Sequence, residues 1–229
     1  MPENRDVHVI VRAYNEATTL ERVLDELVAA GYSVLVVDDG SRDGTSTIAA
    51  RHAVRVVRHP VNLGPGAALQ TGLEAALADG ARRLATFDAD GQHQLHDLAA
   101  CLAALDAGAA DVVFGSRFLR PGDRRSIPWP RRLLLRGSVV VNALLTGHWM
   151  TDAHCGLRAM TRQAAARIHL RERGFAYASE LVAEVRRHRL RLVEVPVTVR
   201  YTDYSLRKGQ TGWNAVNILL DYLTHKVLR

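Results

Sequence analysis

Short runs of β-branched and aliphatic residues alternate, through most of the chain, with longer segments whose apolar positions recur at helical spacing. The clearest helical pattern places Leu20, Val23, Leu24, Leu27 and Val28 on one face. The apolar runs predict strands at residues 7–11, 33–38, 54–58, 83–87, 111–115 and 190–199. The periodic segments predict helices at residues 17–30, 45–53, 66–78, 95–105, 178–188 and 213–228.

Strands separated by helices are typical of right-handed β-α-β units. We therefore expect an α/β fold with a mainly parallel central sheet and helices on both faces. Polar residues follow three of the predicted strands, at residues 12–16, 38–41 and 88–92. Because parallel strands end at one edge of a sheet, where ligands bind in such folds, these segments are expected to line one cleft.

The composition is that of a globular protein with a substantial core. The chain has 229 residues, of which 48% are hydrophobic and 24% charged. Its two cysteines, Cys101 and Cys155, lie far apart, so a reducing cytosol fits better than a disulfide framework or a zinc site. Residues 1–6 lack the features of a secretory signal, and no apolar run approaches the ~20 residues that span a bilayer. We expect one domain over residues 1–212, followed by an amphipathic helix over residues 213–229.

Asp88 and Asp90 flank a small residue directly after a predicted apolar strand. Two carboxylates this close repel each other unless a cation lies between them, and Mg²⁺ or Mn²⁺ prefers oxygen ligands. Gln92 adds a neutral oxygen, whereas His93 is a softer candidate ligand. The alternative interpretation is a polar turn, because Asp and Gly are common turn residues.

A second acidic pair, Asp38 and Asp39, ends another predicted strand. A carboxylate in this place accepts hydrogen bonds from a base or ribose in nucleotide-binding sheets. The alternative is local capping, since Asp43 or Thr45 can cap the following helix and Ser41 can stabilise the turn. We assign capping to Asp43 and ligand contact to Asp39.

Several motifs together resemble family 2 glycosyltransferases of the GT-A fold, and most closely the dolichol-phosphate mannose synthase and polyprenol-phosphate glycosyltransferase branch. The likeness runs in order from about residue 7 to residue 200. It rests on the segments at residues 11–16, 36–41, 62–64, 88–93, 115–118, 152–158 and 193–197. A metal-dependent transferase using a nucleotide-sugar donor and a polyprenyl-phosphate acceptor is what this resemblance implies.

The resemblance also implies roles for individual residues. Nucleotide-sugar contacts are implied for Tyr14, Glu16, Val37, Asp39, Asp88, Ala89, Asp90, Arg117, Arg200 and Lys208. The implied metal ligands are Asp88, Asp90 and Gln92, and the implied catalytic residues are Asp90, Asp152 and Arg117. The acceptor phosphate is implied to meet Arg117, Arg131, Arg132 and Ser138. Lys208, with Arg200, would close over the donor from a loop at residues 201–211.

Two positions depart from the family pattern. Arg12 replaces the proline that usually precedes the Tyr-Asn-Glu run, a modest change if its side chain points to solvent. Leu135 replaces a serine that helps relatives to hold the lipid phosphate, and Ser138 is the substitute one helical turn later.

Positive charge is concentrated in one segment. The formal net charge of the chain is +6, and residues 117–136 contain seven arginines and one acid, Asp123. A lipid phosphate is already an anion and needs no general base, but it does need positive charge beside a donor diphosphate. The arginine segment meets that requirement, and the alternative is a solvated basic face.

Membrane contact is expected next to this segment, where Ile127, Trp129 and the apolar residues 133–135 and 139–141 lie. These positions could instead be core. The terminal helix could pack on its own domain, form a homodimer or pair with a small membrane protein, and packing on the domain is the expectation. We expect a peripheral protein on the cytoplasmic face of the cell membrane.

Rival functions remain at this stage. A family 2 enzyme acting on a saccharide or protein hydroxyl would use Asp152 or Glu180 as a base. A nucleotidyltransferase would need a Gly/Lys-rich loop that residues 12–16 do not form. A nucleic-acid-binding module is disfavoured, because only Phe118 and Trp129 interleave with the arginines and no recognition motif is present. The donor, a GDP-sugar or a UDP-sugar, stays open, and an inverting displacement is implied by the resemblance.

Overall fold

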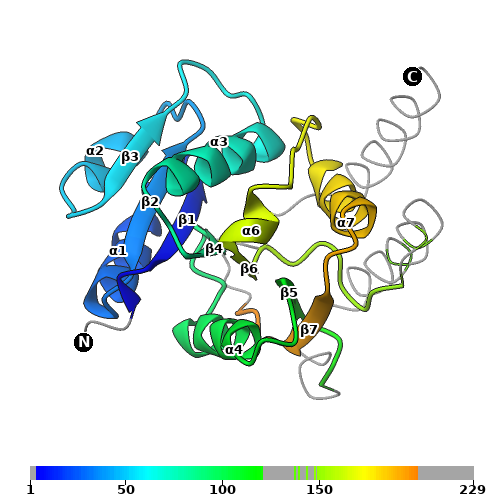
Figure 1. Ribbon diagram of the computed structural model, residues 1–229. Coiled ribbons are helices and arrows are strands. Elements are labelled where there is room, and N and C mark those ends of the chain that lie inside the picture. Colours follow the sequence, from blue (N-terminus) through cyan, green and yellow to red (C-terminus); the bar gives the residue numbers. More distant parts are fainter. Residues whose placement is uncertain are drawn as a thin grey trace.

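The computed structural model describes residues 4–120 and 149–200 together with positions 137, 139, 143 and 147. A β-sheet lies at its centre (Figure 1). In this described part the sheet has seven strands in the order β3-β2-β1-β4-β6-β5-β7. The strands are β1 (Val7–Ala13), β2 (Ser33–Asp38), β3 (Arg55–Arg58), β4 (Arg83–Asp88), β5 (Val112–Ser116), β6 (Arg158–Thr161) and β7 (Leu192–Pro196). All neighbouring pairs are parallel except those that involve β6.

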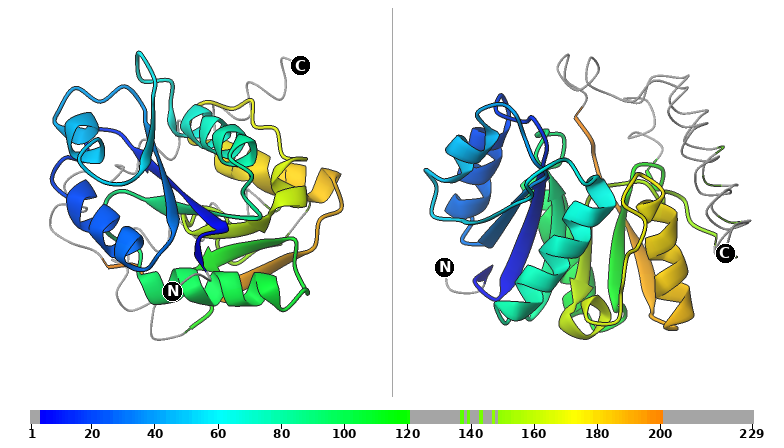
Figure 2. Two further views of the ribbon diagram at one scale, coloured as in Figure 1. Left: turned by 60° about the vertical axis from the view of Figure 1, so that its left-hand side comes forward. Right: turned by 90° about the horizontal axis from the view of Figure 1, so that it is seen from above.

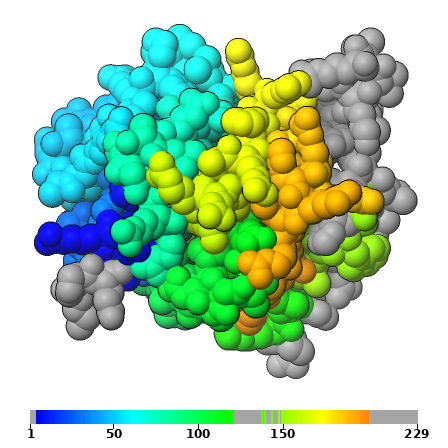
Figure 3. All heavy atoms as spheres, viewed as in Figure 1, coloured from blue at the N-terminus to red at the C-terminus, as the bar shows by residue number. Residues whose placement is uncertain are grey.

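Helices cover both faces of the sheet, as the alternation of elements predicted (Figure 2). The helices are α1 (Leu20–Ala29), α2 (Thr45–Ala49), α3 (Pro65–Ala78), α4 (Leu95–Asp106), α6 (Arg162–Ala165) and α7 (Tyr177–Arg187). One core contains the apolar faces of α1 and α4, and the other contains those of α3, α6 and α7. In the space-filling view, α3 and the chain around α6 and α7 lie side by side over the second face (Figure 3).

The first strand shows how the sequence sends side chains to the two cores. Side chains alternate between the faces of a strand, so Val9 and Val11 enter the core beneath α1 and α4. Ile10 enters the opposite core with α3 and α7. Arg12 shares the parity of Ile10 and therefore lies on that same covered face. Its side chain is only 10% exposed and does not point to solvent, so the condition under which the replacement of proline would be a modest change is not met.

The prediction missed β6 and α6. Strand β6 has only four residues and begins with an arginine, so no apolar run marks it. It lies antiparallel between β4 and β5. Its first residues therefore lie at the edge where β4 and β5 end, and this places the loop at residues 151–157 between those strand ends. Among the described residues, no helix has the length and apolar character needed to cross a membrane.

Candidate functional site

The loop after β4 places two carboxylates in different surroundings. Gly91, with a φ of 70°, lets the chain turn back sharply after Asp90. Asp90 accepts hydrogen bonds from the backbone nitrogen of Gln92 at 3.0 Å and from Gln92 Nε2 at 2.7 Å. Both of these donors are neutral groups of the loop itself.

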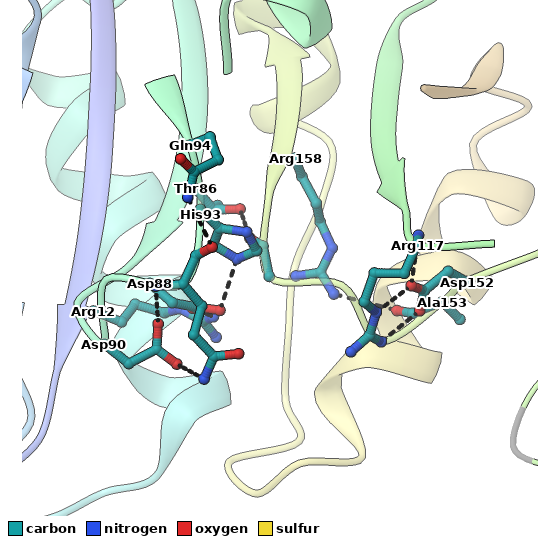
Figure 4. Close-up of polar contacts among 12 residues, drawn as sticks. Arg12, Thr86, Asp88, Asp90, His93, Gln94, Arg117, Asp152, Ala153 and Arg158 are labelled. Atoms are coloured by element: carbon teal, nitrogen blue, oxygen red, sulfur yellow. Dashed lines mark hydrogen bonds and ion pairs between the residues drawn. The ribbon is translucent and has the colours of Figure 1, made fainter. Parts of the chain in front are cut away.

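Asp88 is instead enclosed by three groups. Asp88 and Arg12 are register partners on β4 and β1, and their side chains form an ion pair. On the other oxygen, His93 Nε2 lies 3.2 Å from Asp88 Oδ2. The backbone of Gly156 presses against the same carboxylate, where an added Cβ atom would collide with both oxygens. Figure 4 shows Arg12 and His93 converging on Asp88.

These surroundings shift the pKa values of the two carboxyl groups in opposite directions. Burial raises the pKa of Asp88, but the charge of Arg12 and the hydrogen bond from His93 outweigh it and hold that pKa well below its ordinary value. Burial, together with the negative charge of Asp88, raises the pKa of Asp90 to about 6. Among the described residues, no arginine or lysine forms an ion pair with Asp90, in contrast to Asp88.

A divalent cation fits this arrangement. The amide of Gln92 lies beside the carboxylate of Asp90 and donates to it through Nε2. With the amide turned over, both side chains would present the oxygen ligands that Mg²⁺ or Mn²⁺ prefers. The described residues contain no cluster of three or more His, Cys, Asp or Glu side chains that could hold a metal alone. A cation bound here would therefore complete its coordination with water and ligand phosphates, which is how Mg²⁺ usually binds.

The residues after β5 form a second buried ion pair. Arg117 Nε lies 2.6 Å from Asp152 Oδ2, and Arg117 Nη2 lies 2.8 Å from Asp152 Oδ1. Burial raises the pKa of Asp152, but the charge and hydrogen bonds of Arg117 outweigh it, so this pKa lies below its ordinary value. Two of the three predicted catalytic residues, Arg117 and Asp152, are thus in direct contact (Figure 4).

Glu194 on β7 holds the loop that carries Asp152. Its Oε1 accepts hydrogen bonds from Thr151 Oγ1 at 2.8 Å and from the backbone nitrogen of Asp152 at 3.0 Å. The backbone nitrogen of Thr151 donates to both carboxylate oxygens, at 3.0 and 2.9 Å. Ser116 Oγ also contacts Thr151 Oγ1 at 2.5 Å, which ties the end of β5 to the same loop.

Arg158, at the start of β6, lies between the Asp88 group and the Arg117–Asp152 pair (Figure 4). Its side chain is fully buried, and Nη2 donates to the carbonyl oxygen of Ala153 at 3.3 Å. Both Arg158 and Arg12 contact Tyr177, the first residue of α7. Burial raises the pKa of Tyr177, but the charges of these two arginines outweigh it, so the pKa lies below its ordinary value.

A cavity of about 340 Å³ opens beyond the ends of β1 and β2. Its lining includes Tyr14, Ser41, Arg42 and Arg58. Tyr14 exposes 38% of its surface, and Arg58 Nη2 donates to the carbonyl oxygen of Ser41 at 3.0 Å. An aromatic ring with adjacent guanidinium groups suits a planar ligand that carries hydrogen-bond acceptors.

Asp39 and Val37, two residues predicted to contact the nucleotide, are buried and contact mainly other parts of the protein. Asp39 is 4% exposed, and His59 Nδ1 lies 2.7 Å from its Oδ1. Its carboxylate also accepts the backbone N–H groups of Leu63 and Gly64, each at 2.9 Å, so it anchors residues 62–64. Val37 is fully buried in the core beneath α3, so its predicted nucleotide contact stays a prediction that its side chain does not support.

Other predicted residues lie near the same edge. Ala89 packs in the core with its methyl group, while its carbonyl oxygen accepts from Thr19 Oγ1 at 2.8 Å. The backbone nitrogen of Glu16 donates to Thr45 Oγ1 at 2.8 Å, which joins the loop after β1 to α2. The backbone nitrogen of Arg200 donates to the carbonyl oxygen of Gln92 at 3.0 Å, so residue 200 lies beside the acidic loop.

The capping assignment of Asp43 is confirmed in part. Its Oδ1 accepts from the backbone nitrogen of Thr45, the first residue of α2, at 3.0 Å, although Gly44 occupies the N-cap position. Several predictions lie outside the described residues: the phosphate contacts of Arg131, Arg132 and Ser138, the donor contact of Lys208, and the helix at residues 213–228.

Sequence reasoning missed four residues that shape this site, namely Arg12, Tyr177, Gly156 and Glu194. Strand parity would have placed Arg12 on a helix-covered face. Likewise, an acid between the valines of the strand at residues 192–196 marks a half-buried carboxylate that needs partners. Gly156 and Tyr177 carry no comparable local signal, because their roles arise from close packing between distant segments.

Comparison with known proteins gives consistent matches. The model of the family described as Glycosyl transferase family 2 matches residues 8–168. A UDP-N-acetylglucosamine–dolichyl-phosphate N-acetylglucosaminyltransferase of Methanococcus voltae is 30% identical over 223 residues, covering 89% of each chain. A polyprenol monophosphomannose synthase of Mycolicibacterium smegmatis is 32% identical over 211 residues, covering 87% of this chain and 79% of that one.

Solved structures of glucosyl-3-phosphoglycerate synthase from Mycobacterium tuberculosis share the fold. One is 21% identical with a TM-score of 0.72, and the match covers 96% of this chain and 79% of that one. Another, in complex with Mn²⁺ and UDP-glucose, is 22% identical with a TM-score of 0.62 and the same coverage.

Proposed function

Because this chain belongs to glycosyl transferase family 2 and has the GT-A fold, we propose that it transfers a sugar from a UDP- or GDP-sugar to a polyprenyl or dolichyl phosphate. The observation that carries the proposal is that two polar groups lie at the same edge of the sheet. Asp90 and Gln92, the candidate cation ligands, follow β4, and Arg117 of the buried pair with Asp152 follows β5. The names of the relatives from Methanococcus voltae and Mycolicibacterium smegmatis support a lipid-phosphate acceptor.

The donor would lie across the edge with its base in the cavity beside Tyr14 and its diphosphate toward Asp90. Arg58 and Arg42 supply donors for the acceptor atoms of the base or ribose. Asp90 and Gln92 would hold Mg²⁺ or Mn²⁺, which neutralises charge on the departing nucleoside diphosphate. Lys208 and Arg200 are proposed to close over the donor, and Asp39 to contact the nucleoside.

The proposal that the acceptor is a lipid phosphate rests on the lowered pKa of Asp152, the candidate base. An alcohol acceptor requires a base of moderate pKa near the attacking oxygen. The pKa of Asp152 lies below its ordinary value because of Arg117, which makes this carboxylate a poor proton acceptor. A lipid phosphate arrives already ionised and needs only positive charge. Arg117, which shares its charge with Asp152, is proposed to supply part of that charge. Arg131 and Arg132 are proposed to add to it, and Ser138 to donate a hydrogen bond to the phosphate.

The proposed reaction is a single displacement with inversion at the anomeric carbon. An oxygen of the acceptor phosphate attacks, the bond from the sugar to the donor phosphate breaks, and the electron pair leaves with the nucleoside diphosphate. Arg117 orients the incoming phosphate, and Asp152 fixes the guanidinium so that it enters the reaction already positioned. No proton transfer is required at either oxygen.

Contact with the membrane surface belongs to the same proposal. Leu119, near the start of the arginine-rich segment, and Trp149, 13 residues beyond its end, expose 39% and 69% of their surfaces. Exposed apolar side chains beside basic residues suit the boundary between lipid headgroups and acyl chains. We assign the protein to the cytoplasmic face of the membrane, where the phosphate of a polyprenyl lipid is accessible. A homodimer or a small membrane-protein partner would strengthen this attachment.

Donor binding tests the proposal. Thermal-shift screening with Mn²⁺ is expected to show stabilisation by one class of UDP- or GDP-sugar, lost on addition of EDTA and in Asp90→Ala. The matched control is Asp25→Ala, which removes a 69%-exposed carboxylate on α1 and should leave the shift unchanged. No shift with any nucleotide-sugar, or the same shift in Asp90→Ala, would contradict the proposed donor site.

A further inference from the structure

The two acids of the loop after β4 are separated by one residue, yet the structure gives them different partners. Both oxygens of Asp88 are engaged, one by Arg12 and one by His93 Nε2 at 3.2 Å. Gly156 closes a third side, because its α-carbon packs where any side chain would strike the carboxylate. The described partner of Asp90 is the neutral residue Gln92.

Arg12 is itself fixed from a second element. Its Nη1 donates to Tyr177 Oη at 2.5 Å, and its guanidinium lies 5.1 Å from the centre of the Tyr177 ring. Tyr177 begins α7 and is 6% exposed, so Arg12 is held between the sheet and a covering helix. A buried arginine needs a carboxylate partner, and Asp88 is the one with which it forms an ion pair.

From this geometry we infer that Arg12 is a positioning residue that keeps Asp88 out of cation coordination and leaves Asp90 as the carboxylate that binds the divalent cation. A carboxylate bonded to a guanidinium would have to break that ion pair to bind a metal, exposing a buried positive charge. Asp88 then serves as a fixed anion that, with His93, holds the turn in place. The inference rests on the proposed function for the presence of the cation.

The residue at position 12 determines which carboxylate is free to bind the cation, because its side chain lies next to Asp88. The two residues face each other across β1 and β4 in register, and both lie on the face covered by α3 and α7. A residue without a positive charge at position 12 would leave Asp88 with His93 alone. Asp88 and Asp90 would then both be available to one cation.

The experiment measures Mn²⁺ binding to the full chain through the electron paramagnetic resonance signal of free Mn²⁺, with Mn²⁺ alone and with UDP or GDP. The variants are Asp88→Asn, Asp90→Asn, Arg12→Met and the double variant Arg12→Met/Asp88→Asn. Arg22→Met is the matched control, because Arg22 lies 3.4 Å from the carbonyl oxygen of Gly91 and has no described contact with Asp88. Circular dichroism verifies the fold of each variant.

Loss of a true ligand is expected to weaken Mn²⁺ binding by about tenfold or more in Asp90→Asn. In the wild-type background, Asp88→Asn is expected to change affinity by less than about threefold. Arg12→Met should tighten binding several-fold, and Asp88→Asn should then cost about tenfold, because Asp88 has become a ligand. Arg22→Met should stay within about twofold of wild type, since it removes a charge from a side chain that is 54% exposed.

Three results would overturn the inference. Equal losses in Asp88→Asn and Asp90→Asn would make both acids ligands, and this comparison decides even if Arg12→Met does not fold. Equal effects of Asp88→Asn with and without Arg12 would remove the coupling between them. If the wild-type protein binds no Mn²⁺ under any condition, the proposed cation fails together with the inference, whereas measurable binding with equal losses refutes the inference alone.

Discussion

Glu194 offers a direct test of how the site is held in shape. Its carboxylate accepts hydrogen bonds from Thr151 Oγ1 and from the backbone nitrogens of Thr151 and Asp152, all between 2.8 and 3.0 Å. The change Glu194→Gln keeps the volume of the side chain but replaces one acceptor oxygen with an amide that donates. One N–H group of the loop then faces another donor, and the remaining hydrogen bonds lose their charge.

The loss of one hydrogen bond to a charged group corresponds to about 1.5–3 kcal/mol of unfolding free energy. For a chain of 229 residues, each kcal/mol lowers Tm by about 2–4 °C, so we expect a decrease of about 3–12 °C. Displacement of Asp152 also moves Arg117, and a shift of about 1 Å at a reacting group can cost about a hundredfold in rate. We therefore expect kcat to fall by about tenfold to a hundredfold, with little change in the KM of the donor.

Urea unfolding and initial-rate kinetics measure the two effects. The matched control is Glu26→Gln, the same chemical change at a side chain that is 43% exposed and 3.7 Å from Arg22, where a loss below about 0.5 kcal/mol is expected. If Glu194→Gln is as stable as the control and keeps its wild-type kcat, Glu194 does not position the loop and the reasoning is refuted.

Three further predictions concern the buried charges and one turn. Arg117→Ala should cost about 3–5 kcal/mol in urea unfolding because it leaves Asp152 buried and unpaired. Arg191→Ala, at the solvent-exposed pair with Asp111, is the control and should cost clearly less; equal losses would contradict this. Gly64→Ala should cost at least about 2 kcal/mol, because Gly64 has a φ of 100° and an added Cβ would strike the carbonyl oxygen of Arg173; a loss near zero would show that the turn is not constrained. Because the folded pKa of Asp90 is raised to about 6, its contribution to stability is present below its ordinary pKa and is lost as pH rises through 6. With EDTA, Asp90→Asn should therefore have a higher Tm than wild type at pH 7.5, and the difference should shrink at pH 5; a constant difference would oppose the assigned pKa.

Much of the fold was predictable because its signals are local. The alternation in β1 and the apolar face of α1 fix these elements wherever they pack, and parallel pairing then brings the ends of β1, β2 and β4 together. Strand β6 escaped prediction because four residues beginning with Arg158 show no periodicity. Its position between β4 and β5 is a property of the tertiary fold.

In the site, too, the features with local sequence signals were predictable and those that arise from tertiary contacts were not. The acids at positions 88 and 90 could be chosen from sequence because they follow an apolar strand. The contrast between them could not, because it depends on Arg12 across the sheet and on Gly156 from a distant loop. Asp39 illustrates the opposite case, since a strand-end acid that suited a ribose also accepts three hydrogen bonds from its own protein.

The most direct test of the account is the transfer reaction itself. The purified chain is mixed with Mn²⁺, with a polyprenyl phosphate in detergent and with the nucleotide-sugar that gives the largest thermal shift, and the products are identified by mass spectrometry. We expect a polyprenyl phosphate carrying one sugar, formed with one equivalent of nucleoside diphosphate and only while Mn²⁺ is present. Transfer to a saccharide hydroxyl with the polyprenyl phosphate left unchanged would contradict it.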